Sequence, residues 1–280
     1  MIVFPPCKIN LGLRILRKRS DGYHDLETCF FPLPLYDALE AVRDPDPDPS
    51  GIRFTQSGIL LQVETQTNTC VKAYALLRDR FHDLPAVQMH LHKQVPAGAG
   101  LGGGSADGAF SLRLLNEMFR LGLANQELME LAARLGSDCA FFTQDGPALA
   151  TGRGEVLEPF RIDLSDFSIL LVNPGIHIAT AAAFAMIRPA TPTDRLKELL
   201  AKPPQTWRGR VLNDFEEPVF ARFPEIRSIA ETLYTAGALY ASLSGSGSSV
   251  YGIFPRKHSN YPVFPAHYFT RILLPDRRPN

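Results

Sequence analysis

The sequence predicts an α+β protein, in which strands and helices follow one another without the regular strand–helix–strand repeat of a doubly wound sheet. Three observations lead to this prediction. Residues 7–15 alternate in polarity with the period of a strand. Residues 105–121 carry apolar side chains at spacings of three and four, which is typical of an amphipathic helix. A second helical pattern, at 126–135, follows this helix directly instead of a strand.

The N-terminal strand has one apolar face, and its other face carries Lys8 and Asn10. Because residues two apart in a strand point the same way, these two side chains are expected to lie side by side. A polar turn at 20–22 and a mixed, partly extended segment through Phe31 follow. Residues 44–51 begin with alternating aspartate and proline, so every second residue lacks an amide hydrogen. We expect an exposed hairpin tip or loop there.

The later elements are predicted from periodicity and from turn residues. The helix 126–135 ends at Gly136, as helices commonly do. A chain of 280 residues is long enough for one or two domains, and we place domains at 1–160 and 161–280. Besides those named above, the predicted helices are 71–81, 180–187, 194–200 and 226–236, and the predicted strands are 87–95, 168–172 and, closing the chain, 249–254.

Composition excludes several classes of protein. The chain has 29 Lys and Arg against 29 Asp and Glu, and no basic run, so it offers no electrostatic footprint for nucleic acid or an anionic membrane surface. Its apolar stretches are far shorter than the roughly 20 residues that cross a bilayer. Pro5, Pro6 and Lys8 interrupt the apolar N-terminus, which predicts a cytoplasmic protein. A small-molecule enzyme, monomeric or homodimeric, fits this composition best.

No structural metal or disulfide is predicted. The cysteines are scattered without a C-x-x-C pair, so reduced, structural thiols are expected. His90 and His92 share a strand face, but no third ligand accompanies them, and we interpret them as part of a polar strand face. The four cysteines are Cys7, Cys29, Cys70 and Cys139.

The most informative segment is the glycine loop 96–105, PAGAGLGGGS, between a predicted strand and the strongest predicted helix. It has five glycines within seven residues. Glycines let bare backbone amides approach an anion, and a helix N-terminus adds the positive end of its dipole. A linker would not open directly into an amphipathic helix, so the segment predicts a phosphate-binding loop.

Two common phosphate loops fit poorly. The Walker type needs a lysine before its final serine or threonine, and Gly104 precedes Ser105 here. Gly98, Gly100 and Gly103 satisfy the G-x-G-x-x-G pattern of dinucleotide-binding enzymes. That fingerprint requires a strand after the helix, ending in an acidic residue for the ribose, and a helix follows instead. The dehydrogenase interpretation is therefore disfavoured.

The pattern P-x-x-x-G-L-G-G-G-S resembles the phosphate loop of the GHMP kinase superfamily. Further motifs stand in the superfamily's order from residue 8 to residue 248, and together they most resemble its branch acting on a cytidyl-linked methylerythritol. The resemblance implies a two-domain α+β fold in which ATP and substrate meet in the cleft between the domains. These motifs are Lys8–Leu11, Asp21–Leu26, Gly136–Phe142, Asn213–Glu216 and Leu243–Ser248.

The resemblance also implies catalytic and nucleotide-binding residues. Asp138 is expected to act as the base toward the substrate hydroxyl, with Lys8 beside it. From the residues alone, Asp138 can begin a short helix, and Lys8 offers a fixed positive charge. Ser105 is expected to contact a phosphate oxygen or Mg²⁺, to cap its helix, or both. The ATP-binding residues implied are Pro96, Ala97, Gly98, Ala99, Gly100, Leu101, Gly102, Gly103, Gly104, Ser105 and Ala106, with Asn68 and Lys93 at the adenine.

Substrate contacts are implied in the same way. The resemblance places Tyr23 in a stack on the cytosine, with His24 hydrogen-bonded to the base and Phe184 on the opposite side. Stacking on a base is worth about 1–3 kcal/mol, so a pair of rings suits a pyrimidine. Asn10 and Thr180 complete the implied substrate site. Thr180 is the single hydroxyl residue kept in 177–180, where the family usually has several.

The reaction that the resemblance implies is ATP-dependent phosphorylation of the 2-hydroxyl of 4-diphosphocytidyl-2-C-methyl-D-erythritol in the non-mevalonate isoprenoid pathway. Mg²⁺ is expected to enter alongside ATP. Two alternatives stay open: another kinase of the superfamily, acting on homoserine, mevalonate or a sugar, and a nucleotide-binding regulator without catalysis. If Tyr23, His24 and Phe184 did not form a base clamp, that is, a pair of aromatic surfaces around the cytosine, another kinase of the superfamily would be favoured. ATP binding without ADP production would favour the second.

Overall fold

The computed structural model describes residues 1–46, 49–59 and 64–276, so Pro47 and Asp48 of the predicted aspartate–proline loop lie outside the described residues. The described chain forms two compact units. Unit 1 comprises Met1–Cys7, Leu35–Ala97 and Gly102–Asp145, and unit 2 comprises Lys8–Pro34, Gly98–Leu101 and the described residues from Gly146 onward. The chain passes between the units several times, and the division at residue 160 stays a prediction.

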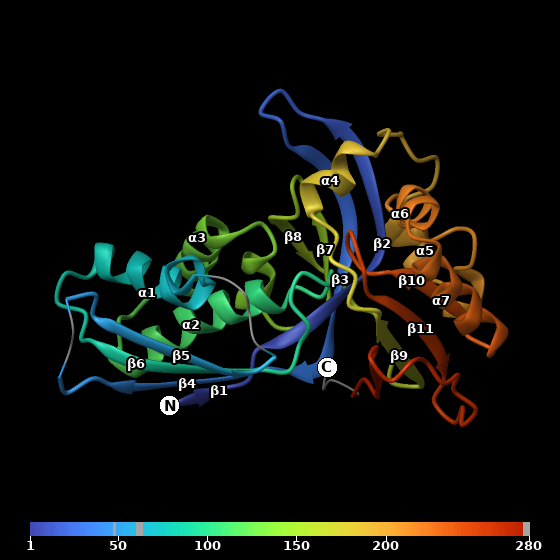
Figure 1. Cartoon of the computed structure of the whole chain (residues 1–280). Coiled ribbons are helices and arrows are strands. Elements are labelled where there is room, and N and C mark those ends of the chain that lie inside the picture. The colour runs from blue at the N-terminus through green and yellow to red at the C-terminus, as the bar shows by residue number, and fades with distance from the viewer. Residues whose placement is uncertain (47–48, 60–63, 277–280) are drawn as a thin grey trace. The chain divides into compact units, whose positions relative to one another are not determined.

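Unit 1 is a four-stranded sheet with helices on one face (Figure 1). Strand β5 runs parallel to β6, and the other pairs are antiparallel. Because β4 and β5 flank β6 instead of pairing with each other, they form no hairpin, and the described residues of 44–51 lie outside helices and strands. The strand order is β1 (Ile2–Val3), β4 (Ala38–Arg43), β6 (Val87–Lys93), β5 (Ile52–Gly58); the helices are η1 (Thr65–Thr67), α1 (Thr69–Arg80), α2 (Gly103–Phe119), α3 (Asn125–Leu135) and η2 (Cys139–Thr143).

Unit 2 holds two further sheets and the remaining helices. In the first sheet the order is β2 (Pro6–Lys18), β3 (His24–Tyr36), β7 (Ala148–Thr151), β8 (Val156–Pro159). In the second it is β10 (Tyr240–Leu243), β11 (Val250–Pro255), β9 (Phe167–Asn173), β12 (Phe269–Leu273). The helices are α4 (Thr180–Ala185), α5 (Leu196–Leu200), η3 (Pro204–Thr206), α6 (Glu216–Arg222) and α7 (Pro224–Thr235).

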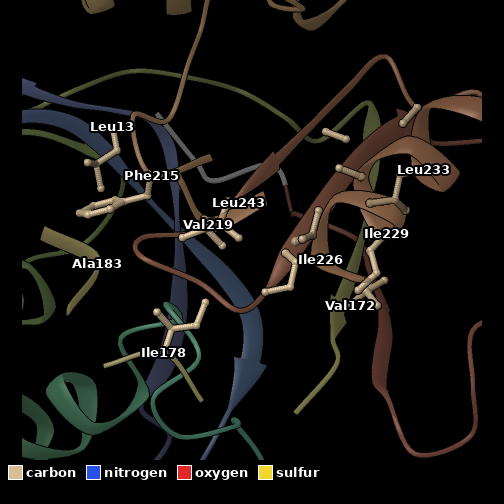
Figure 2. Packing of buried hydrophobic residues seen from close by; sticks show 14 of the residues in the cluster. Leu13, Val172, Ile178, Ala183, Phe215, Val219, Ile226, Ile229, Leu233 and Leu243 are labelled. Carbon is tan, nitrogen blue, oxygen red and sulfur yellow. The ribbon is translucent and has the colours of Figure 1, made fainter. Parts of the chain in front are cut away.

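The core of unit 2 fixes the strands and turns that carry its functional residues. Helix α7 buries Ile226, Ile229 and Leu233, at the three- and four-residue spacing of one helix face. They join a cluster that includes Val172 of β9 and Phe215 before α6 (Figure 2). Burying a large apolar side chain contributes about 1.5–3 kcal/mol, so this cluster holds the second sheet of unit 2 against its helices.

The mixed α+β class is confirmed, and each predicted helix is present with ends within two residues of the prediction. The strand 249–254 corresponds to β11, but it does not close the chain, because β12 follows it. Short strands with weak alternation, such as β7 and β8, were not predicted. Within the described segments, no helix combines the length and apolar character that a bilayer crossing requires.

Candidate functional site

The first half of the glycine loop, residues 98–101, is anchored in unit 2 through its carbonyl oxygens. Among the described residues, the amides of residues 98–102 donate no hydrogen bond. Carbonyls held by the protein and amides left over give the segment the polarity of an anion site. The bonds are Ser249 N to Ala99 O (3.2 Å), Ser244 Oγ to Gly100 O (2.8 Å), Lys8 Nζ to Gly100 O (3.4 Å) and Lys8 N to Leu101 O (2.9 Å).

Gly100 packs backbone to backbone against a second glycine turn, residues 243–248. Its φ is +77°, and a Cβ there would lie 1.9 Å from the carbonyl oxygen of Ser244. Only glycine adopts this conformation at such close approach. The anchored half of the loop therefore depends on where the second turn is held.

The second turn is held by Asn213 and Glu216. The Asn213 amide donates to Leu243 O (2.8 Å) and Gly245 O (2.9 Å). The Glu216 carboxylate accepts from Ser242 Oγ (2.7 Å) and Leu243 N (2.9 Å), and burial raises its pKa. The sequence showed Asn213–Glu216 as a motif without a role. The polar side chains of this motif, directly before and at the start of a short helix, were the available signal, and the structure shows that Asn213 and Glu216 hold the second turn in place.

Lys8 lies on β2 with 3% of its surface exposed. Its ammonium donates to Asn10 Oδ1 at 2.7 Å and lies 4.9 Å from the centroid of the Phe30 ring. Asn10 Nδ2 donates in turn to Thr28 Oγ1 (3.0 Å), which orients the amide so that its oxygen faces the lysine. The predicted pairing of Lys8 with Asn10 is confirmed, and it places a fixed cation beside the anchored glycines of unit 2.

The second half of the glycine loop begins helix α2 in unit 1. Gly102 is the N-cap residue with a φ of +68°, and Ser105 lies in the first turn of the helix. The expectation that Ser105 caps the helix is therefore wrong, because the cap position comes three residues earlier. Thr69 Oγ1 donates to the carbonyl of Gly104 (2.6 Å), which fixes the first turn against α1.

Asn68 and Lys93, the predicted adenine contacts, both have protein partners in unit 1. Asn68 is the N-cap of α1, and its side chain accepts from Cys70 N at 2.9 Å. Lys93 is 1% exposed, and its ammonium donates to Asp37 and to Asp107. Both residues thus have structural contacts, and their assignment to the adenine stays a prediction.

Asp138 stands directly before the short helix η2, as predicted, but its side chain makes no cap hydrogen bond. Capping therefore does not explain this residue. Burial raises the pKa of the neighbouring Cys139 thiol to about 12, although a hydrogen bond with Ser105 acts in the opposite direction. All four cysteines are buried, and none of them is bonded to another in the described part of the chain. Asp138 belongs to unit 1 and Lys8 to unit 2.

The predicted base-clamp residues all belong to unit 2. The His24 ring stacks on Phe184 with centroids 5.0 Å apart and an interplanar angle of 21°. Tyr23 is 57% exposed, and the Arg153 guanidinium lies 4.9 Å from its ring centroid. Thr180 begins α4, with its hydroxyl 3.5 Å from that of Ser246. The ring that faces Phe184 is therefore His24, and the stack of Tyr23 on a base stays a prediction.

The polar strand face with His90 and His92 is joined by hydroxyl groups. Ser57 Oγ lies 2.9 Å from His90 Nε2 and 2.9 Å from His92 Nδ1. Thr55 Oγ1 lies 2.7 Å from His90 Nδ1. Over the described ranges, no group of three or more His, Cys, Asp or Glu side chains is placed to hold a metal ion. The two histidines are accounted for by these hydrogen bonds.

Comparison with family models gives two matches, the GHMP kinases N-terminal domain over residues 68–147 and the GHMP kinases C-terminal domain over residues 194–263. Among curated proteins, the chain is 49% identical over 254 residues to a 4-diphosphocytidyl-2-C-methyl-D-erythritol kinase of Bacteroides fragilis, covering 91% of this chain and 92% of the relative. It is 44% identical over 276 residues to the enzyme of that name from Parabacteroides distasonis, covering 99% and 97%.

Solved structures agree with these matches. A crystal structure of 4-(cytidine 5'-diphospho)-2C-methyl-D-erythritol kinase superposes with a TM-score of 0.78 at 26% identity, covering 99% of this chain and 100% of that chain. A homoserine kinase from Cytophaga hutchinsonii superposes with a TM-score of 0.66 at 16% identity, covering 92% and 85%. The second match shows a shared fold alone.

Proposed function

Because the chain belongs to the GHMP kinase family, we propose that it transfers the terminal phosphate of ATP to the 2-hydroxyl of 4-diphosphocytidyl-2-C-methyl-D-erythritol. The observation that carries this proposal is 49% identity, over nine-tenths of both chains, to a relative named for that reaction. The products are ADP and the 2-phosphate, in the non-mevalonate route to isoprenoid precursors.

The phosphates of ATP are proposed to bind at the glycine loop, from Pro96 to Ala106. The amides of residues 98–102, which donate no hydrogen bond to the described residues, supply donors, and the N-terminus of α2 supplies a positive dipole end. Because the carbonyls of Ala99, Gly100 and Leu101 are already bound by the protein, they do not turn toward the phosphates and repel them. Asn68 is the proposed contact to the adenine side, whereas the ammonium of Lys93, predicted beside it, is bound to Asp37 and Asp107.

Asp138 and Lys8 are the proposed catalytic residues. As the hydroxyl oxygen bonds to the γ-phosphorus, its proton passes to the Asp138 carboxylate, and the bond to the β–γ bridging oxygen breaks to release ADP. Lys8 would stabilise negative charge on the transferring group, since Asn10 and Phe30 hold its ammonium in place. Asp138 and Lys8 belong to different units, so support for these roles comes from the family motifs and not from a distance between the two side chains.

Mg²⁺ is proposed to enter with ATP. This cation keeps several waters and is usually held by one or two protein groups together with substrate phosphates, so a dedicated protein cage is not required. The hydroxyl oxygen of Ser105, in the first turn of α2, is the side-chain group of the glycine loop that could serve as a Mg²⁺ ligand. When bound, the cation neutralises phosphate charge.

The cytidyl group is proposed to bind at Tyr23, His24 and Phe184, with Asn10 and Thr180 as further substrate contacts. The stacked His24–Phe184 pair presents an aromatic surface of the kind on which a base stacks. The exposed Tyr23 ring is available for the opposite side of the base. A cytoplasmic location, and a monomeric or homodimeric state, stay predictions.

The test is ADP release with the cytidyl substrate, and with homoserine, mevalonate and galactose in parallel. We expect activity with the cytidyl substrate, and a fall of about 10²-fold or more for Asp138→Asn and Lys8→Ala. Asp145→Asn and Lys18→Ala are matched controls, because Asp145 has a 90% exposed side chain and Lys18 lies at the exposed end of β2. Activity with another alcohol alone, or ATP binding without ADP, would contradict the proposal.

A further inference from the structure

A buried cluster of three charges lies in unit 1 beside the glycine loop. Lys93, Asp37 and Asp107 are each 1% exposed. The Lys93 ammonium donates to Asp37 Oδ2 and to Asp107 Oδ2, the latter at 2.7 Å. Two carboxylates share one ammonium, so the cluster carries a net negative charge when all three groups are ionised.

The cluster joins the two pieces of chain that flank the glycine loop. Lys93 ends β6, three residues before Pro96, and Asp107 is the fifth residue of α2. Asp37 also holds the strand end, because its Oδ1 accepts from Gln94 N (2.6 Å) and Val95 N (2.9 Å). The strand before the loop and the helix after it are therefore tied through a single ammonium.

Close packing shows that the position of the Asp37–Lys93–Asp107 cluster sets where helix α2 begins. A Cβ on Gly103, the first residue of α2, would lie 2.9 Å from Val95 Cγ1 and 3.3 Å from Lys93 Nζ. The start of the helix thus lies directly on the strand end and the lysine. A shift of the cluster would move the first turn of α2, which is the part of the helix that faces a bound anion.

Stability alone does not explain the cluster. A buried ion pair is often no better for stability than apolar residues of the same volume, since removing charges from water is costly. Here the cost is larger, because Asp107 Oδ1 is buried and has no hydrogen-bond partner in the described part of the chain. The cluster leaves one buried carboxylate oxygen without a hydrogen bond, yet it fixes the start of α2. This suggests that the cluster is kept because it positions the helix.

We propose that Asp37, Lys93 and Asp107 are positioning residues that hold the N-terminus of α2 where its amides can bind the phosphates of ATP. This inference rests on the proposed kinase function. It assigns Lys93 a role through the backbone of the loop, in place of direct recognition of the adenine. It also gives roles to two aspartates that the sequence analysis did not single out.

The test uses Asp107→Ala, Asp107→Asn and Lys93→Met in the full chain. Asp107→Ala removes the ion pair that connects α2 to Lys93. We expect the KM for ATP to rise at least about tenfold, while the KM for the cytidyl substrate and kcat change much less. Asp107→Asn keeps an oxygen for Lys93 and leaves one neutral ion pair, so it should fold and give an intermediate KM. Asp44→Asn is the matched control, because Asp44 is a buried carboxylate of the same unit, bound by Arg53 and Gln88.

Three outcomes would overturn the inference while the wild type releases ADP normally. An unchanged KM for ATP in both Asp107 variants would remove the positioning role. Tighter ATP binding in Asp107→Asn would mean that the excess negative charge of the cluster, and not the ion pair between Lys93 and Asp107, determines the affinity for ATP. A selective loss of ATP against GTP in Lys93→Met would mean that Lys93 reads the base, since a displaced loop weakens both nucleotides alike. Wild-type protein without ADP release would instead contradict the proposed function.

Discussion

Replacing Gly100 by alanine gives the sharpest test of the loop's construction. The new Cβ would lie 1.9 Å from the Ser244 carbonyl oxygen, and real Cβ contacts essentially never fall below 3.0 Å, so one backbone must move by about 1.1 Å. A misplacement of about 1 Å can cost about 10²-fold in rate, which corresponds to about 2.7 kcal/mol of transition-state stabilisation. We expect kcat/KM for ATP to fall by about that factor.

Gly209→Ala is the matched control for backbone strain. Gly209 has a φ of +71°, close to the +77° of Gly100, and a Cβ there would meet nothing within 4 Å. Both variants should lose about 1–2 kcal/mol of unfolding free energy from the left-handed backbone, but only Gly100→Ala should lose activity. Urea unfolding and coupled ADP release measure the two effects. If Gly100→Ala keeps kcat/KM within threefold of Gly209→Ala, the loop does not depend on this contact.

Three further outcomes are expected. Phe184→Ala removes the ring stacked on His24, so the KM for the cytidyl substrate should rise by about tenfold while the KM for ATP stays constant; equal changes in both would contradict a base-binding role. Burial, together with Asp37, raises the pKa of Asp107 to about 7, so the folded chain holds a proton that the unfolded chain releases near pH 4. This contribution to stability is present below about pH 4 and is lost as the pH rises through about 7; the wild type should therefore lose stability across that range relative to Asp107→Asn, and parallel unfolding curves would count against it. Gly103→Ala should raise the KM for ATP, because its Cβ would lie 2.9 Å from Val95, and an unchanged KM would separate the helix start from phosphate binding.

The glycine loop and its flanking elements were accessible from sequence because their signals are local. A period of two over residues 7–15 and a period of three to four over residues 105–121 each reflect one buried face, and burial decides both elements in the structure. The phosphate loop followed from glycines at a helix start. The resemblance to a kinase family then supplied residue roles that no spacing alone could give.

The buried charge cluster was beyond sequence reasoning, because its members come from three separate segments. Asp37 lies outside every predicted element, Asp107 occupies one polar position of the predicted helix 105–121, and Lys93 belongs to the predicted strand 87–95. Only the fold shows that all three side chains are withdrawn from water and bound to one another. The cap of α2 was predicted wrongly for a different, local reason. Ser105 is a better N-cap residue than Gly102, but the left-handed backbone at Gly102 starts the helix three residues earlier.

The two halves of the glycine loop are held by different means, and this difference predicts how each fails. Residues 98–101 are fixed by hydrogen bonds to their carbonyls, so their position depends on the turn that Asn213 and Glu216 support. The helix start at Gly103 is fixed by packing on a buried ammonium, so its position depends on charge balance and volume. Both anchors leave backbone amides as the groups still able to bind a ligand. Damage to either should therefore appear first as weaker binding of ATP, whereas damage to the aromatic rings near His24 should appear in the other substrate.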